Sequence, residues 1–232
     1  MKKRIVFIIL LCFTFFSNAT PFSQRKFYMA FLKSDLTEWH DFIVSHSMVS
    51  EDSLLLVLDL EYNYLAWAST KKLADNMLRL GVFNRHIKEY SQQPDANPSD
   101  VLAFQSASHV YSLSILEKVS VSHSLQAISC SGQACKKNPT ARALMHQGFM
   151  YFYRPNYAGG NKDKALFYLR QAEKMYKKQA DSDNNWNLRN TQMHIAQCLI
   201  KLDRKNDAEH YIKRVLRDES DFQFLRELLK DI

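Results

Sequence analysis

Apolar residues recur at intervals of three and four along almost the whole of this chain, and no other feature restricts its fold as strongly. Phe27, Phe31, Leu36, Trp39 and Ile43 begin the pattern. This interval places side chains on one face of an α-helix, whereas a half-buried strand requires strict alternation, which is hard to find here. Only 5 glycines and 5 prolines interrupt the 232 residues. The sequence therefore predicts an all-α protein with no sheet.

The periodic segments predict helices joined by short turns. Asp35 and Glu38 have the spacing of a capping box, and Ser50 to Asp52 open a long helix that runs past Trp67. Further helices are expected at about 70–90, 99–117, 119–136, 140–153, 162–179, 186–202, 204–217 and 220–230. The clearest linker is QQPDANPS at 92–99, because prolines halt helices. We therefore divide the chain into an N-terminal part at 20–93, a linker at 94–99 and a repeat-bearing part at 100–232.

The first residues have the pattern of a secretory signal peptide. A basic start, MKKR, precedes an apolar run from Ile5 to Phe16, and Ser17 to Ala19 supply a small-x-small end. The run holds 12 residues, fewer than the roughly 20 that span a bilayer. We expect residues 1–19 to be removed near Ala19 during export to the periplasm or cell envelope. A retained N-terminal anchor and a lipid anchor at Cys12 are the alternatives, and the second lacks a small residue before the cysteine.

Removal of this segment would leave a chain without an obvious nucleic-acid or membrane signal. The formal net charge of +7 falls to +4 when Lys2, Lys3 and Arg4 leave. No long run of lysine or arginine remains, so nucleic acid is not an expected partner. The nearest apolar run, LLLVLDL at 54–60, is broken by Asp59. We therefore expect no membrane span in the mature chain.

A recurring spacing of small and large residues marks the C-terminal part. It passes through Ala196, Leu199, Ala208 and Ile212, at intervals of 3, 9 and 4. Small residues are required where two helices cross closely, and large residues fill the space between neighbouring helix pairs. The preceding pair repeats the spacing, with the central interval lengthened from 9 to 14. Its packing positions are Gly148, Tyr151, Ala165, Leu169 and Ala172.

Earlier segments carry looser versions of the same spacing. They are Ala127, Ser131, Ala134 and Pro139, and Tyr62, Leu65, Ala74, Leu78 and Gly81. These spacings resemble those of the tetratricopeptide repeat (TPR) family. The narrower resemblance, to small exported bacterial TPR proteins, rests on two segments, NYAGGNKDKALFYLRQAEKMY and NNWNLRNTQMHIAQCLIKLDRKNDAEHYIKRVLRDESDF. The resemblance covers about the last 90 residues and departs from the family in the insertion and in missing tryptophan and proline consensus positions. It implies a right-handed superhelix of antiparallel helix pairs, a TPR-like α-solenoid, with capping helices at both ends.

In such a superhelix the first helix of each pair lines a concave groove. The register places these side chains there: Asn63, Trp67, Arg142, Phe149, Tyr153, Asn190, Met193, Gln197 and Lys201, with Gln105 and His109 as weaker candidates. Amides and cations bind a peptide main chain and carboxylate, and aromatic rings seat its side chains. The expected function is an exported, non-catalytic adaptor that holds a protein or peptide partner. The alternatives are a structural subunit of an envelope complex, using convex or end surfaces, and an enzyme with an unrecognised helical active site.

Gly159 and Gly160 stand between the two helices of the lengthened pair. We expect them to allow positive φ where the chain reverses, a conformation that costs other residues about 1 kcal/mol. A phosphate-binding loop would instead end in Gly-Lys-Ser/Thr after a strand, and the sequence here is Gly-Gly-Asn-Lys-Asp. The two glycines are therefore interpreted as a structural turn.

The cysteines and histidines show no catalytic or metal-binding pattern. Cys130 and Cys135 lie on one expected helix, about 7.5 Å apart along its axis, and a disulfide requires Cα atoms within about 7 Å. Free thiols are favoured, although a helix break at Gly132 would permit a bridge. Cys198 is expected to pack in the core. A zinc site from His123, Cys130 and Cys135 lacks a fourth ligand, and no cofactor is expected.

Overall fold

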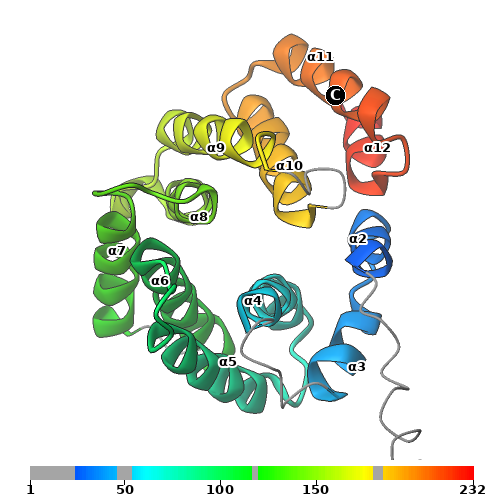
Figure 1. The fold of residues 1–232 in the computed structure, drawn as a ribbon. Helices are drawn as coiled ribbons and strands as arrows, with labels where there is room; N and C mark the ends of the chain where they lie inside the picture. The colour runs from blue at the N-terminus through cyan, green and yellow to red at the C-terminus, as the bar shows by residue number, and fades with distance from the viewer. Residues whose placement is uncertain (1–23, 46–53, 117–119, 180–184) are drawn as a thin grey trace, which may run out of the picture.

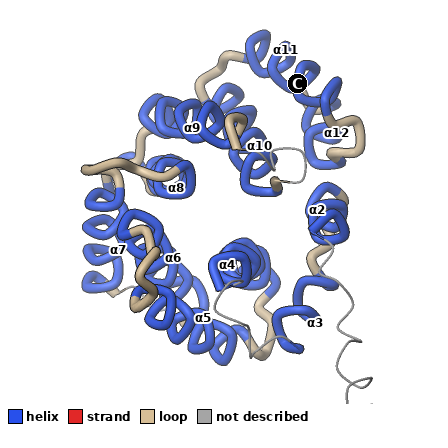
Figure 2. The backbone as a smooth tube through the Cα atoms, in the orientation of Figure 1, coloured by secondary structure: helices blue, strands red, loops and turns tan. Residues whose placement is uncertain are grey.

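The computed structural model describes residues 24–45, 54–116, 120–179 and 185–232, and its regular structure there is entirely helical (Figures 1 and 2). The expected signal peptide and the expected helix start at Ser50 lie outside these residues. The helices are α2 (Gln24–Leu32), α3 (Thr37–Ser45), α4 (Leu54–Lys71), α5 (Asn76–Ser91), α6 (Pro98–Ile115), α7 (Val121–Ala134), α8 (Ala141–Tyr153), α9 (Lys162–Tyr176), α10 (Trp186–Lys201), α11 (Lys205–Asp218) and α12 (Gln223–Lys230), with a short 3-10 helix, η2 (Asn156–Ala158). The all-α prediction is confirmed for the described residues.

Side-chain caps fix where five of the helices begin. The caps of α6 to α10 are Asn97, Ser120, Thr140, Asn161 and Asn185, and each accepts a hydrogen bond from a backbone N–H in the first turn. A cap satisfies one of the donors that a helix start leaves free and contributes about 1 kcal/mol. Pro98 follows the first cap, so α6 begins inside the expected linker.

Successive helices pack against each other in chain order from α4 to α12. The pair α8 and α9 is antiparallel. The rings of Tyr151 and Tyr168 stack with centroids 5.6 Å apart, and at the other end the hydroxyl of Tyr176 lies 3.9 Å from the sulfur of Met145. Residues late in α9 therefore contact residues early in α8. Two antiparallel helices joined by a short connection have this arrangement.

The positions predicted to pack between helices lie in the interior. Fully buried are Ala165, Leu169, Ala172, Ala196, Leu199, Ala208 and Ile212. Gly148 is also buried, and a Cβ atom built there would lie 2.6 Å from Cγ of Leu169 and 3.3 Å from the carbonyl oxygen of Ala165. Helix α8 therefore approaches α9 as closely as a residue without a side chain allows. Tyr151 is half-buried in its stack.

The looser spacing assigned around α5 is wrong. Ala74 and Gly81 are exposed, and Leu78 is 62% exposed. The chain turns at Lys72, where φ is +51°, and α5 begins only at Asn76 rather than near residue 70. Because α5 begins later than expected, a different set of its side chains faces the core. The buried apolar face of α5 carries Leu80, Phe83, Ile87 and Tyr90.

The two glycines between α8 and α9 act in different ways. Gly159 has a φ of +87°, as expected for a turn. Gly160 is outside the left-handed region, but a Cβ atom there would lie 1.8 Å from the carbonyl oxygen of Arg154, and its N–H donates to the Pro155 carbonyl at 2.9 Å. The prediction of a positive φ is thus confirmed for Gly159 only. A glycine is required at position 160 because the backbone of Arg154 leaves no room for a Cβ atom.

One hydrophobic core extends across the connection between α5 and α6. The rings of Phe83 and Phe104 meet edge to face with centroids 5.9 Å apart, one on each side of the 94–99 segment. Both belong to the core cluster that continues to Leu225 near the C-terminus. The connection is therefore a turn inside one packed unit.

The N-terminal helices lie against the C-terminal ones, as Figure 1 shows for α2 beside α12. The Tyr28 hydroxyl donates to a Glu219 carboxylate oxygen at 2.5 Å and accepts from Nε of Arg189 at 2.7 Å. The rings of Trp39 and Trp186 meet edge to face with centroids 5.2 Å apart. The described helices therefore close into a ring instead of ending as an open row.

The close approach at Gly148 makes a testable prediction. We expect Gly148→Ala to lower the free energy of unfolding by about 1–2 kcal/mol, because the new methyl group would overpack a buried helix crossing. Gly132→Ala on α7 is the matched control, since nothing lies within 4 Å of its Cβ position. Alanine there should raise stability by about 0.5–1 kcal/mol through helix propensity. Urea unfolding of both variants tests the prediction, and equal effects would show that α8 and α9 do not cross at Gly148.

Candidate functional site

Arg142 lies inside the ring between two carboxylates. Its Nε and Nη2 donate to the Asp59 oxygens of α4 at 2.7 and 2.5 Å, and its Nη1 lies 2.8 Å from an Asp100 oxygen in the first turn of α6. Burial would lower the pKa of Arg142, but attraction by Asp59 and Asp100 raises it, so the guanidinium stays charged. The expectation that Arg142 faces an open groove is wrong. Arg142 extends from α8 into the space between α4 and α6, and only 9% of its surface is exposed.

Two more expected groove residues form an interior amide network. Asn63 of α4 donates from Nδ2 to Oδ1 of Asn187 at 2.9 Å, and Asn190 donates from Nδ2 to Oδ1 of Asn63 at 2.8 Å. Asn63 and Asn190 are buried and bonded to each other, so the prediction that they are exposed is also corrected. Buried amides are stable only when paired in this way. The network joins α4 to α10 across the middle of the ring.

His146 of α8 lies in a buried hydrogen-bond chain with a Ser–His contact. Ser106 donates its hydroxyl to the Ala127 carbonyl oxygen at 2.7 Å, so it accepts from Nε2 of His146, 2.8 Å away. The remaining ring nitrogen, Nδ1, accepts from the Tyr62 hydroxyl at 3.0 Å. Burial lowers the pKa of His146 to about 4, which keeps the ring neutral. Ser106 is fully buried and its proton points away from the imidazole, so this contact lacks the geometry of an activated nucleophile.

His194 of α10 holds an aromatic cluster at the edge of this interior. Its Nδ1 donates to the Asn190 carbonyl oxygen at 2.9 Å, which leaves Nε2 to accept from the Tyr153 hydroxyl at 2.7 Å. The Phe149 ring lies 4.2 Å from the imidazole, centroid to centroid. Burial lowers the pKa of His194 to about 4. Tyr153 is nevertheless 66% exposed, so it combines a fixed hydroxyl with an accessible ring.

The expected groove residues that keep contact with solvent lie toward the C-terminal ends of α4 and α8, and from the middle of α10 to its end. We call this set the rim: Trp67, Phe149, Tyr153, Met193, Gln197 and Lys201. Tyr153 and Lys201 are exposed and the other four are half-buried. His194 brings Phe149 and Tyr153 together, whereas Trp67 contacts Tyr64 and Lys71 of its own helix.

The weaker candidates on α6 do not join the rim. Gln105 and His109 are half-buried. His109 turns to α7, where its Nδ1 lies 3.0 Å from Nδ1 of His123. Burial, and then His123, lower the pKa of His109.

The residues that organise the interior are not among those expected from the sequence. They are Asp59, Glu61, Asp100 and His146, of which the first two interrupt an apolar run. Glu61 is buried with both carboxylate oxygens 3.0 Å from Nδ1 of His86. Burial raises the pKa of Glu61, and His86 only partly offsets that rise. A charged residue within an apolar helix was the available signal, because such a charge must find a partner when the helix is buried.

Other expectations fall outside the site. Cys130 and Cys135 are free and half-buried, on α7 and at its C-cap, and Cys198 is free and buried. Within the described ranges, no three or more His, Cys, Asp or Glu residues gather as a metal site would require. None of the described helices is both long and apolar enough to cross a membrane. No family model, curated protein or solved structure matches the chain.

His146 and His194, two of the buried histidines, predict a stability loss in mild acid. An unfolded histidine takes up a proton near pH 6.5, whereas His146 in the folded chain does so only near 4. The unfolded state therefore binds more protons between these values, and stability falls as pH decreases through that window. For each such histidine the loss by pH 4.5 is on the order of 2 kcal/mol.

We expect His146→Gln to reduce this acid sensitivity, because glutamine can still donate to Ser106 and accept from Tyr62 but does not titrate. The exposed His210→Gln should keep the parent profile. The measurement is urea unfolding at several pH values from 7.5 to 4.5. A His146→Gln profile parallel to the parent would contradict a neutral, buried His146.

Proposed function

We propose that this chain is an exported adaptor of the TPR type, a right-handed superhelix of antiparallel helix pairs that binds a protein or peptide partner without chemistry of its own. Support for the repeat type comes from helices that pack in chain order and from small buried residues where they cross. Support for export comes from the basic start and the apolar run at residues 5–16. The groove itself is bridged by side chains, so we assign partner binding to the rim.

Tyr153 is the observation on which this assignment rests. Its ring is largely exposed, yet its hydroxyl is fixed by His194 and its edge is held by Phe149 and Phe152, with centroids 6.5 and 5.0 Å away. An exposed aromatic side chain that is already ordered loses little entropy when a partner covers it. Binding energy in protein interfaces is concentrated in such residues. Tyr153 is therefore the anchor that we propose for the partner.

The residues around Tyr153 favour a peptide segment over a small apolar molecule. Gln197 has a buried side-chain oxygen with no hydrogen-bond partner among the described residues. Because this oxygen has almost no exposed surface, it can accept from a peptide N–H only after the Gln197 side chain rotates outward. Lys201, exposed one helical turn further along α10, adds a cation for a carbonyl or carboxylate. The combination of ring, amide and cation suits a peptide with both main-chain and side-chain contacts.

A structural subunit remains the second candidate because of one observation on α7. Val121, Leu125 and Ile128 follow each other at intervals of four and three and are 69%, 62% and 38% exposed. This spacing forms one face of the helix, and exposed apolar patches often mark contacts between proteins. The enzyme alternative gains no such support, because the Ser106–His146 contact is buried.

Site-specific photocrosslinking in intact cells that produce the chain separates these candidates. The photoreactive residue benzoylphenylalanine is placed at Tyr153 on the rim, at Leu125 on α7 or at Phe167 on α9. The three native side chains are 66%, 62% and 61% exposed, so the three positions are about equally accessible to a partner. We expect one discrete crosslinked protein from position 153, with none from 125 or 167. Adducts from position 125 alone would replace the adaptor with the subunit, and equal or absent adducts at all three positions would refute rim binding.

A further inference from the structure

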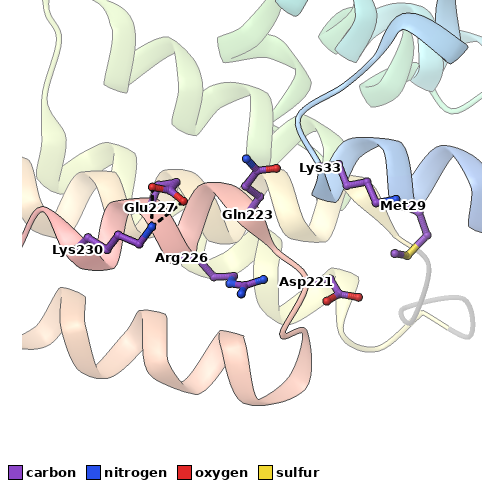
Figure 3. Close-up of a pocket in the computed structure, with 7 residues that line it drawn as sticks. All are labelled: Met29, Lys33, Asp221, Gln223, Arg226, Glu227 and Lys230. Atoms are coloured by element: carbon purple, nitrogen blue, oxygen red, sulfur yellow. Dashed lines mark hydrogen bonds and ion pairs between the residues drawn. The ribbon is translucent and has the colours of Figure 1, made fainter.

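A hollow lies between α2 and α12, where the two ends of the described chain meet (Figure 3). Its volume is about 540 Å³, and it is open to solvent, because six of the seven residues that line it are exposed. It is lined by Met29, Lys33, Asp221, Gln223, Arg226, Glu227 and Lys230. Figure 3 shows Met29 on α2 and Lys33 just after it on one side, Asp221 and Arg226 opposite them, and Glu227 and Lys230 paired further along α12.

The charges around this hollow are only partly paired. Lys230 contacts both carboxylate oxygens of Glu227, at 2.9 and 3.0 Å, so these two charges neutralise each other. The side chains of Lys33, Arg226 and Asp221 have no ion-pair or hydrogen-bond partner among the described residues. Two cations and one anion therefore face the same space without contacting each other. A ligand that carries both an anionic group and an N–H donor would complement all three.

We propose that this hollow binds the free carboxyl end of a peptide chain. The planar guanidinium of Arg226 matches a carboxylate with two parallel hydrogen bonds, and the Lys33 ammonium adds a second positive charge. Asp221 accepts from a main-chain N–H of the bound peptide. The amide of Gln223 can donate to a peptide carbonyl or accept from an N–H. Each polar group at a peptide end thus has a counterpart.

The remaining lining residue favours an apolar side chain at the end of that peptide. Met29 is half-buried and belongs to the apolar edge of the core. A methionine side chain adapts its shape to different apolar partners. Asp221 disfavours a doubly charged phosphate, because its carboxylate would repel the second negative charge. A peptide that ends in an apolar residue therefore fits better than an inorganic anion.

This site is separate from the rim and does not depend on the function proposed for it. Its residues come from α2 and the residue after it, and from α12 and the turn before it, whereas the rim belongs to α4, α8 and α10. A ligand here would also contact both ends of the described chain. Binding is therefore expected to stabilise the closed arrangement of α2 and α12.

Peptide titrations followed by NMR chemical shifts test the proposal. The probes are an acetylated hexapeptide that ends in leucine, the same peptide with an amidated end, and N-acetylleucine. We expect the free acid to shift the amide signals of α12 and to bind at least tenfold more tightly than the amide, because the charge-assisted hydrogen bonds are lost. Equal binding of acid and amide, or no binding of either, would overturn the carboxylate site. N-acetylleucine that binds as tightly as the hexapeptide would overturn the peptide assignment.

Matched variants locate the binding energy. Lys33→Gln/Arg226→Gln should weaken binding of the free acid at least tenfold. It should leave the melting temperature nearly unchanged, because both side chains are exposed and have no ion-pair or hydrogen-bond partner among the described residues. Lys205→Gln/Arg217→Gln removes the same charge from exposed positions on α11 and should retain binding. Equal loss in both variants would show a general effect of charge instead of a site. The rim experiment at Tyr153 is unaffected by either outcome.

Discussion

Arg142 holds three helices in one relative arrangement, and the rest of the interior depends on it. Its guanidinium connects α8 to Asp59 on α4 and to Asp100 at the start of α6. Thr140, the cap of α8, donates its hydroxyl to the second oxygen of Asp100, so the start of α8 is fixed to the same group. A buried cation is tolerated only with such close partners. Once these charges are paired, α4 cannot leave the inner face of the ring without exposing them.

Everything else on the inner face follows from the position of α4. Tyr62 then reaches His146, and Asn63 reaches Asn187, so α4 is linked to both α8 and α10. A set of neutral and charged hydrogen bonds bridges the surface that an open superhelix would present to a partner. Such a network favours one arrangement of helices over others of similar apolar content, because each alternative leaves a polar group unpaired. The accessible parts of the inner helices are consequently their C-terminal ends.

The sequence was sufficient for features that arise from local contacts. Helical periodicity located nearly every helix, and the small residues Ala165, Ala172 and Ala196 marked interior positions because crossings of neighbouring helices require them. The burial of Arg142 could not be predicted in this way. Its partner Asp59 is 83 residues away in the chain, and only the packing of α4 brings the two together. The start of α5 was also missed, because the turn at Lys72 requires a positive φ at a residue that does not usually adopt it.

The most direct test of the central role of Arg142 is the stability of Arg142→Met compared with Arg204→Met. Both arginines contact carboxylates closely, but the Arg204 side chain is 49% exposed and the Arg142 side chain is 10% exposed. Removing Arg142 leaves Asp59 and Asp100 as unpaired charges and should lower the free energy of unfolding by about 3–5 kcal/mol. Loss of the exposed pair at Arg204 should change it by less than about 1 kcal/mol. Equal small losses, measured by urea unfolding at pH 7, would contradict the account.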